Sequence, residues 1–119
     1  MRIFKTKWFA REASSHGISD DELYQAIQSA LQGKVVDLGG GVYKKRLNKN
    51  CDRAIILTKS AEYWFYNFLY AKQDMANINH RELMGFRELA KHYANLSEEK
   101  TTVLVKSKEL VEICDDSKK

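Results

Sequence analysis

The segment GGGVYKKRLNKNCDR, residues 39–53, combines three glycines and five basic side chains with a single carboxylate. Residues 42–53 hold five of the 20 lysines and arginines of the chain but only one of its 16 acidic residues, so the rest of the chain is balanced in charge. A solvated surface usually mixes both signs, whereas a patch of one sign attracts polyanions. The segment therefore favours a binding site for phosphate groups, and a solvated basic hairpin without a ligand is the alternative.

Strand geometry would bring three of these cations together. In an extended chain successive side chains point to opposite faces, so Lys44 and Arg46 share one face and Tyr43 and Lys45 share the other. If Tyr43 packs on the helices, Lys44 and Arg46 face away from them. Arg53 begins the next β segment across a short loop, and we expect it near them on the open face. Like charges that converge without a carboxylate are costly unless an anion lies among them.

Two amphipathic helices are predicted on either side of the basic segment. The first covers about residues 20–32, where Ser19 and Glu22 have the spacing of a capping box. The second covers about residues 80–94 and begins after Asn79. Their apolar side chains recur at helical spacing; they are Leu23, Ala26, Ile27, Ala30 and Leu31 in the first helix, and Leu83, Phe86, Ala90 and Tyr93 in the second.

The β-branched and aromatic content between these helices predicts an antiparallel meander of three strands. The strands are expected at residues 42–47, 53–58 and 62–70. Shorter strands are expected at residues 2–5 and 35–38, with a helical turn at residues 7–13 between the first strand and the first helix.

The chain is expected to form one domain, residues 1–119, because it has no prolines, internal repeats or low-complexity linker. Residues 97–119 form a C-terminal extension with two interpretations: Ser97 caps a short helix, or ELVEIC forms a late edge strand. The pattern predicts the α+β class, a small antiparallel sheet packed by two or three helices. Seven side chains are expected in a single core; they are Leu23, Ile27, Leu31, Ile56, Phe65, Phe86 and Ala90.

The composition, 44% hydrophobic and 30% charged, is that of a globular protein. No apolar run approaches the roughly 20 residues that span a bilayer, and the first residues do not resemble a signal peptide. Cys51 and Cys114 form neither a disulfide framework nor a metal cluster. We therefore expect a cytoplasmic protein that needs no metal, no other cofactor and no membrane.

The basic segment and the elements after it resemble the RelE/HigB superfamily of toxins from type II toxin–antitoxin systems. The resemblance rests on glycines before a strand with Lys-x-Arg, a polar loop, an Arg that opens the next strand, and an aromatic strand that ends in AKQDMANI before an amphipathic helix. It covers about residues 19–96. It implies a compact α+β fold and a ribosome-dependent mRNA endonuclease, or mRNA interferase, that blocks translation and arrests growth.

The resemblance also implies partners and leaves alternatives. The partners would be mRNA, the ribosome and a cognate antitoxin, expected to be a small DNA-binding protein whose acidic segment covers the basic face. The related ParE branch inhibits DNA gyrase without cleaving RNA. A ParE-like gyrase inhibitor and a simple RNA-binding module are therefore the alternatives to the enzyme.

The catalytic residues of the family fall on Lys44, Arg46 and Arg53. A further basic residue after the aromatic strand is matched by Lys72, whereas Gln73 occupies a place where many relatives have Arg. Residues 75–79 contain no counterpart of the Tyr that some members have there. RNA-binding contacts are expected from a wider set of four residues: Lys45, Lys49, Tyr70 and Lys72.

Metal-free RNA cleavage needs the ribose 2′-OH to lose a proton, the phosphate to be stabilised and the leaving 5′-oxygen to gain a proton. None of the three histidines, His16, His80 and His92, lies in the basic segment, and each is interpreted as an ordinary surface or helix-end side chain. A lysine crowded by other cations gives up its proton more readily, so Lys44 is predicted to act as base or charge stabiliser. The arginines are predicted to clamp the phosphate, while the ribosome orients the mRNA.

Two other features have both a structural and a functional interpretation. The aromatic run at residues 63–70 could stack on bases, but a central aromatic strand is more often core, with Tyr70 as the expected exception. The glycines at residues 39–41 lack the context of a phosphate loop and are predicted to form a flexible turn that lets an RNA backbone approach.

Overall fold

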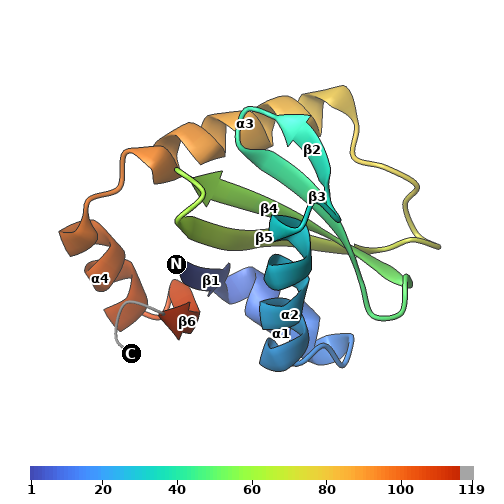
Figure 1. The fold of residues 1–119 in the computed structure, drawn as a ribbon, viewed down its shortest axis with the longest axis horizontal. Helices are drawn as coiled ribbons and strands as arrows, with labels where there is room; N and C mark the ends of the chain where they lie inside the picture. Colours follow the sequence, from blue (N-terminus) through green and yellow to red (C-terminus); the bar gives the residue numbers. More distant parts are fainter. Residues whose placement is uncertain (116–119) are drawn as a thin grey trace.

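The computed structural model describes residues 1–115, in which helices and strands follow one another with short connections (Figure 1). The elements in chain order are β1 (Arg2–Thr6), α1 (Lys7–Ser15), α2 (Asp20–Leu31), β2 (Val36–Gly39), β3 (Val42–Leu47), β4 (Asp52–Lys59), β5 (Tyr63–Ala71), α3 (His80–Ala94), α4 (Glu98–Lys106) and β6 (Leu110–Asp115). Within these residues no helix is both long and apolar enough to cross a bilayer.

The strands form one six-stranded sheet in the order β2-β3-β4-β5-β1-β6. Strands β3, β4 and β5 form the antiparallel meander of three strands expected from the sequence, and β2, the short strand expected at residues 35–38, extends it beside β3. Strand β1 lies parallel to β5 on one side and antiparallel to β6 on the other. The α+β class is therefore confirmed, and the two ends of the described chain lie side by side in the sheet (Figure 1).

Helices cover both faces of the sheet, with α1 and α2 on one side and α3 on the other (Figure 1). The core is consequently divided in two, and the prediction of a single core is wrong. Ile56 packs in the cluster beneath α1 and α2, whereas its neighbour Ile55 packs in the cluster beneath α3. Both side chains are fully buried because successive strand residues face opposite sides.

Most of the residues predicted as core are buried, with two differences. Leu31 is 50% exposed, since it lies in the last turn of α2, and Phe86 is only partly buried. Helix α2 and helix α3 begin at the predicted residues, after the side-chain caps of Ser19 and Asn79.

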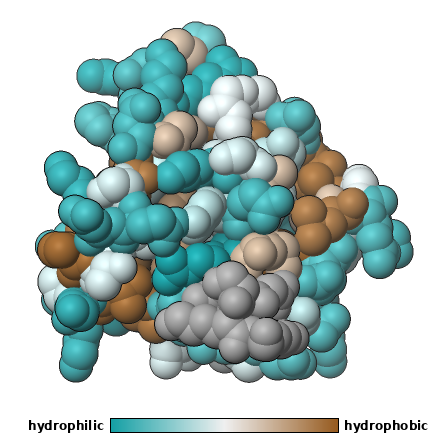
Figure 2. Space-filling model, turned by 60° about the vertical axis from the view of Figure 1, so that its left-hand side comes forward, coloured by the Kyte–Doolittle hydropathy of each residue, from teal (hydrophilic) through white to brown (hydrophobic). Residues whose placement is uncertain are grey.

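The C-terminal segment combines both interpretations that the sequence left open. Ser97 caps α4, and ELVEIC lies almost entirely within β6, which completes the sheet beside β1. Residues 116–119 of the predicted extension lie outside the described residues. The surface around α4 shows apolar patches separated by hydrophilic side chains (Figure 2).

The buried hydroxyl of Tyr66 provides a test of the packing between α2 and the sheet. It donates a 2.6 Å hydrogen bond to the carbonyl oxygen of Leu23, and burial raises the pKa of Tyr66 well above its usual value. The unfolded chain loses this proton near pH 10 while the folded chain keeps it, so stability is lost as the pH rises through about 10. Tyr66→Phe should cost about 0.5–1.5 kcal/mol at pH 7.

The Phe variant should also lose less stability than the parent between pH 9 and pH 11, a window around the roughly pH 10 at which an unfolded tyrosine ionises. Urea unfolding of both proteins at several pH values measures the difference. An identical alkaline loss in the two proteins would show that Tyr66 does not titrate on unfolding.

Candidate nucleic-acid interface

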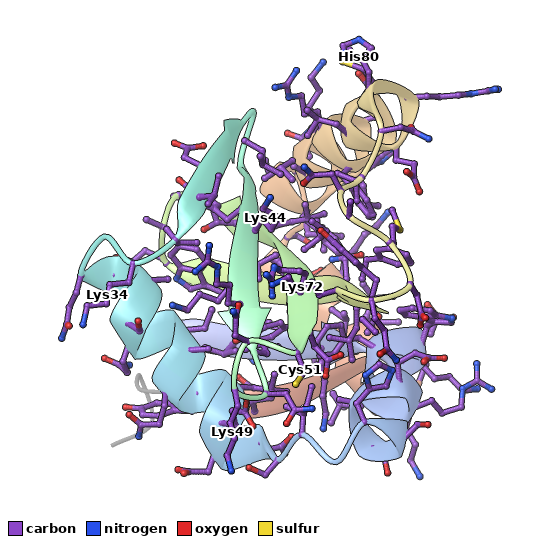
Figure 3. The ribbon with its side chains drawn as sticks, turned by 90° about the vertical axis from the view of Figure 1, so that its right-hand side faces the viewer. Lys34, Lys44, Lys49, Cys51, Lys72 and His80 are labelled. Atoms are coloured by element: carbon purple, nitrogen blue, oxygen red, sulfur yellow. The ribbon has the colours of Figure 1, made fainter. Side chains whose placement is uncertain are left out.

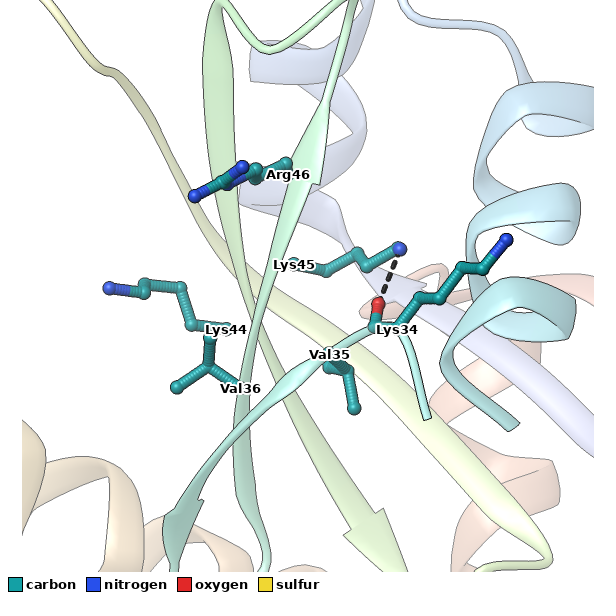
Figure 4. A pocket seen from close by; sticks show the side chains of 6 residues that line it. All are labelled: Lys34, Val35, Val36, Lys44, Lys45 and Arg46. Carbon is teal, nitrogen blue, oxygen red and sulfur yellow. Dashed lines mark hydrogen bonds between the residues drawn. The ribbon is translucent and has the colours of Figure 1, made fainter. Parts of the chain in front are cut away.

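Strand pairing brings Lys44, Arg46 and Arg53 onto one face of the sheet, as expected from alternation. Arg46 and Arg53 are direct partners across β3 and β4, and Lys44 lies opposite Ile55 two pairs further along. This is the face that α3 covers, because Ile55 packs in the α3 cluster. The side chains of Lys44 and Arg46 point to the same side of β3 (Figure 4). We call these three residues the cationic face.

Arg53 is buried, unlike the exposed strand cation expected from its charge. It is 8% exposed and its Nη1 donates to the carbonyl oxygens of Asn50, at 3.0 Å, and Asp52, at 3.1 Å. Three consecutive residues, Asn48 to Asn50, have φ values of 54°, 53° and 70°, which curl the loop back toward the strand. Arg53 thus stabilises the β3–β4 loop with Nη1, while its other two guanidinium nitrogens form no hydrogen bond with residues 1–115.

A buried polar cluster holds the same loop from the opposite face of the sheet. The carboxylate of Asp52, 2% exposed, accepts a hydrogen bond from Asn48 Nδ2 at 2.9 Å and lies 3.0 Å from His16 Nδ1. The backbone N–H of Asn48 donates to Glu22, so this carboxylate serves the loop instead of completing the capping box predicted for α2. The sequence interpretation of His16 as a surface or helix-end side chain is correct in that His16 caps the C-terminus of α1, but it did not include the contact with Asp52.

Lys44 is engaged by the connection between β5 and α3. Its Nζ donates a 2.8 Å hydrogen bond to Oδ1 of Asn77, which lies 33 residues further along the chain. An anion that binds Lys44 would replace this amide. The signal in the sequence is weak, since Asn77 belongs to the short polar segment AKQDMANI and only tertiary structure brings it to β3.

Tyr70 lies directly opposite Arg53 on β5 and is 6% exposed. Its hydroxyl is buried without a hydrogen-bond partner among the described residues. Burial raises the pKa of Tyr70, the nearby Arg53 lowers it, and Glu82 raises it. The buried ring offers no open surface to a base, so the expectation that Tyr70 differs from its neighbours in exposure is wrong. Trp64, Phe65 and Tyr66 are buried as predicted.

The remaining predicted RNA contacts separate into two groups. Lys49 at the tip of the β3–β4 loop and Lys72 just beyond β5 are exposed, and the Lys72 N–H donates to the carbonyl of Cys51, which joins these two segments. Figure 3 shows Lys44 and Lys72 on the side that faces the viewer. Lys45 belongs to the opposite face of β3, where its Nζ donates to Ser29 Oγ at 2.9 Å.

Arg87 of α3 packs against the glycine turn between β2 and β3. Gly40 has a φ of 66°, and a Cβ at this position would lie 2.8 Å from Arg87 Cγ. Arg87 also donates to the carbonyl oxygens of Gly39 and Leu38. The close approach that glycine permits is therefore made by Arg87 in this structure, and the approach of an RNA backbone to the turn stays a prediction.

Comparison with models of sequence families matches residues 1–113 to the RelE toxin of the RelE / RelB toxin–antitoxin system. The chain belongs to the RelE toxin family. The match extends beyond the resemblance seen at residues 19–96 and includes β1, α4 and most of β6. A search of curated proteins and a search of solved structures gave no match. This RelE toxin is accordingly the toxin component of a toxin–antitoxin system, and its family implies an antitoxin partner.

The two arginines of the cationic face should differ sharply in their effect on stability. Arg53→Ala removes two charged hydrogen bonds to loop carbonyls and should lower the free energy of unfolding by about 1.5–3 kcal/mol. Arg46 pairs with Arg53 across the strands but is exposed. Arg46→Ala should therefore change the free energy of unfolding by less than about 0.5 kcal/mol. Urea unfolding of the two variants makes the comparison, and equal losses would contradict the structural role of Arg53.

Proposed function

We propose that this RelE toxin is a metal-independent endoribonuclease that cuts mRNA on the ribosome and so blocks translation. The observation that carries the proposal is the cationic face itself. Lys44, Arg46 and Arg53 converge from adjacent strands, and none of them forms an ion pair with a carboxylate within residues 1–115. Such a face is suited to a phosphate group.

Lys44, Arg46 and Arg53 would each have a separate role in the cleavage step. Lys44 takes the proton of the 2′-OH or stabilises the negative charge on the attacking oxygen, after Asn77 has been displaced from its Nζ. The 2′-oxygen then bonds to phosphorus while the bond to the 5′-oxygen breaks, and that oxygen takes up a proton from water. Arg46 and Arg53 hold the phosphate oxygens, on which charge develops, because guanidinium groups remain protonated and bind two oxygens at once.

The ribosome would position the mRNA for cleavage, which compensates for the lack of an efficient acid and base on the cationic face. His16 lies on the opposite face beside Asp52, and His80 lies at the start of α3, away from Lys44 (Figure 3). His92 lies in the last turn of α3 next to Tyr93, which stacks on Phe65 beside Leu57 at the apolar end of β4. Among residues 1–115, none of the three histidines therefore places a side chain that exchanges protons readily near neutral pH beside the three cations. Positioning of the mRNA in line for attack on the ribosome compensates for a modest acid and base.

The same observation favours a second candidate, a protein that binds without cutting. A basic face without a histidine, and with the Tyr70 hydroxyl buried, also suits a ParE-like inhibitor of DNA gyrase or an RNA-binding module. The two candidates differ in what removal of a cation does. A binder loses affinity and salt dependence, whereas an enzyme loses rate even when saturated.

Arg46→Ala is the sharpest test of cleavage because the structure places Arg46 on the surface and Arg53 in a structural role. With the toxin saturating, single-turnover cleavage of mRNA on programmed ribosomes should fall about 10²- to 10³-fold. Lys100→Ala, on α4 at the other end of the sheet, should cut at the rate of the parent. A variant Arg46→Ala that cuts as fast as the parent would refute the assignment of Arg46. If the parent never cuts, with or without ribosomes, the binding candidate is correct.

We further propose that the antitoxin covers the cationic face with an acidic segment, because opposite charges steer and orient association. Expression of this chain alone should arrest growth, and co-expression of the small protein encoded beside it should restore growth. Arg46→Glu should slow association with that protein at low salt, while Lys100→Glu should not. Equal association rates for the two variants would place the antitoxin on another surface.

A further inference from the structure

A small pocket lies at the point where β2 separates from β3 (Figure 4). Strand β2 pairs with β3 only from Val42 to Lys44. Beyond Lys44, no other strand of residues 1–115 pairs with that side of β3. The pocket has a volume of about 280 Å³ and is lined by four cations and two valines: Lys34, Val35, Val36, Lys44, Lys45 and Arg46.

The charge of this pocket is uncompensated within the described residues. No carboxylate lines it, and none of its four cations takes part in an ion pair of residues 1–115. The pKa of Lys45 is lowered, first by burial and then by the charges of Lys34 and Arg46, so these like charges lie close enough to repel one another. An anion between them would relieve this repulsion.

The four cations differ in how freely they can reach a ligand. Lys45 is fixed, because its Nζ donates to Ser29 Oγ and to the carbonyl oxygen of Lys34. Lys34 and Arg46 are exposed, and in the described part of the chain neither side chain has a hydrogen-bond partner. Lys34 and Arg46 therefore remain able to close on a bound anion, with Lys45 as a fixed charge behind them.

The pocket continues the cationic face around the edge of the sheet. Lys44 and Arg46 project to one side of β3, and Lys34 and Lys45 lie on the other (Figure 4). Val36, which is 49% exposed and pairs with Lys44, adds an apolar surface on the side of Lys44 and Arg46. The pocket is smaller than the roughly 300–1,000 Å³ typical of small-molecule sites. Its size and its charges on two sides suit one phosphate and its sugar within a longer polyanion.

We propose that this pocket binds a phosphate of an RNA strand whose adjoining nucleotides lie on the cationic face. Lys34 is the distinguishing contact, since it belongs to the pocket and not to the cationic face. The inference rests on the proposed function for the identity of the polyanion. It goes further by assigning a path for the strand over the β2–β3 edge and a binding role to a residue outside the proposed catalytic group.

Lys34→Gln tests the pocket, and Lys100→Gln on α4 is the matched control because both lysines are exposed and lose one charge. Binding of a short labelled single-stranded RNA is measured by fluorescence anisotropy at several salt concentrations. Lys34→Gln should weaken binding roughly threefold to tenfold and lower the slope of log K against log salt by about 0.7 relative to Lys100→Gln. Both variants should melt at the temperature of the parent.

Two further measurements identify the strand and separate this inference from cleavage. If Lys34→Gln weakens binding to the free RNA, the pocket holds the mRNA; if it weakens only binding to vacant ribosomes, the pocket holds ribosomal RNA. On programmed ribosomes Lys34→Gln should raise the half-saturating toxin concentration and leave the saturated rate unchanged. A parent that binds RNA through Lys34 but never cuts would refute cleavage and leave the pocket supported. Affinity and salt slope equal to those of Lys100→Gln in both binding assays would overturn the pocket.

Discussion

The buried carboxylate of Asp52 is the constraint around which the β3–β4 hairpin is arranged. A charge removed from water must be satisfied by partners, and Asn48 and His16 meet its two oxygens from the loop and from the end of α1. The loop that results directs the carbonyl oxygens of Asn50 and Asp52 toward Arg53. Satisfaction of Asp52 on one face of the sheet therefore sets the position of Arg53 on the other.

One face of β3 and β4 is apolar at one end, where it packs, and basic at the other end, where it is proposed to bind. On β3 this face runs from buried Val42, through Lys44, to exposed Arg46; on β4 it runs from Leu57 to Arg53. The apolar ends pack beneath α3. The charged ends extend past that contact, so the rigid sheet presents the cations while the α3 core holds their backbone in place.

The sequence predicted the elements well because each has a local cause. Ser19, Asn79 and Ser97 mark helix starts, and alternation along β3 correctly separated Lys45 from Lys44 and Arg46. What it did not predict depends on residues far apart in the chain.

The link from His16 to Asp52 spans 36 residues and the link from Lys44 to Asn77 spans 33, and no periodicity reveals either. The burial of Arg53 follows from a loop with three successive positive φ values at residues other than glycine, which residue type alone does not indicate. The division of the core likewise depends on the sheet order, in which β1 enters between β5 and β6.

That position of β1 has a consequence for how the chain folds. Its neighbours are β5, more than 50 residues later, and β6, more than 100 residues later, so its pairings close the longest loops in the molecule. Contacts of such high sequence separation slow folding, whereas β3, β4 and β5 pair through short turns. The hairpin that carries the cations can thus form early. Strand β1 is synthesised first, but it completes its pairing only after β6, the last strand, has been synthesised.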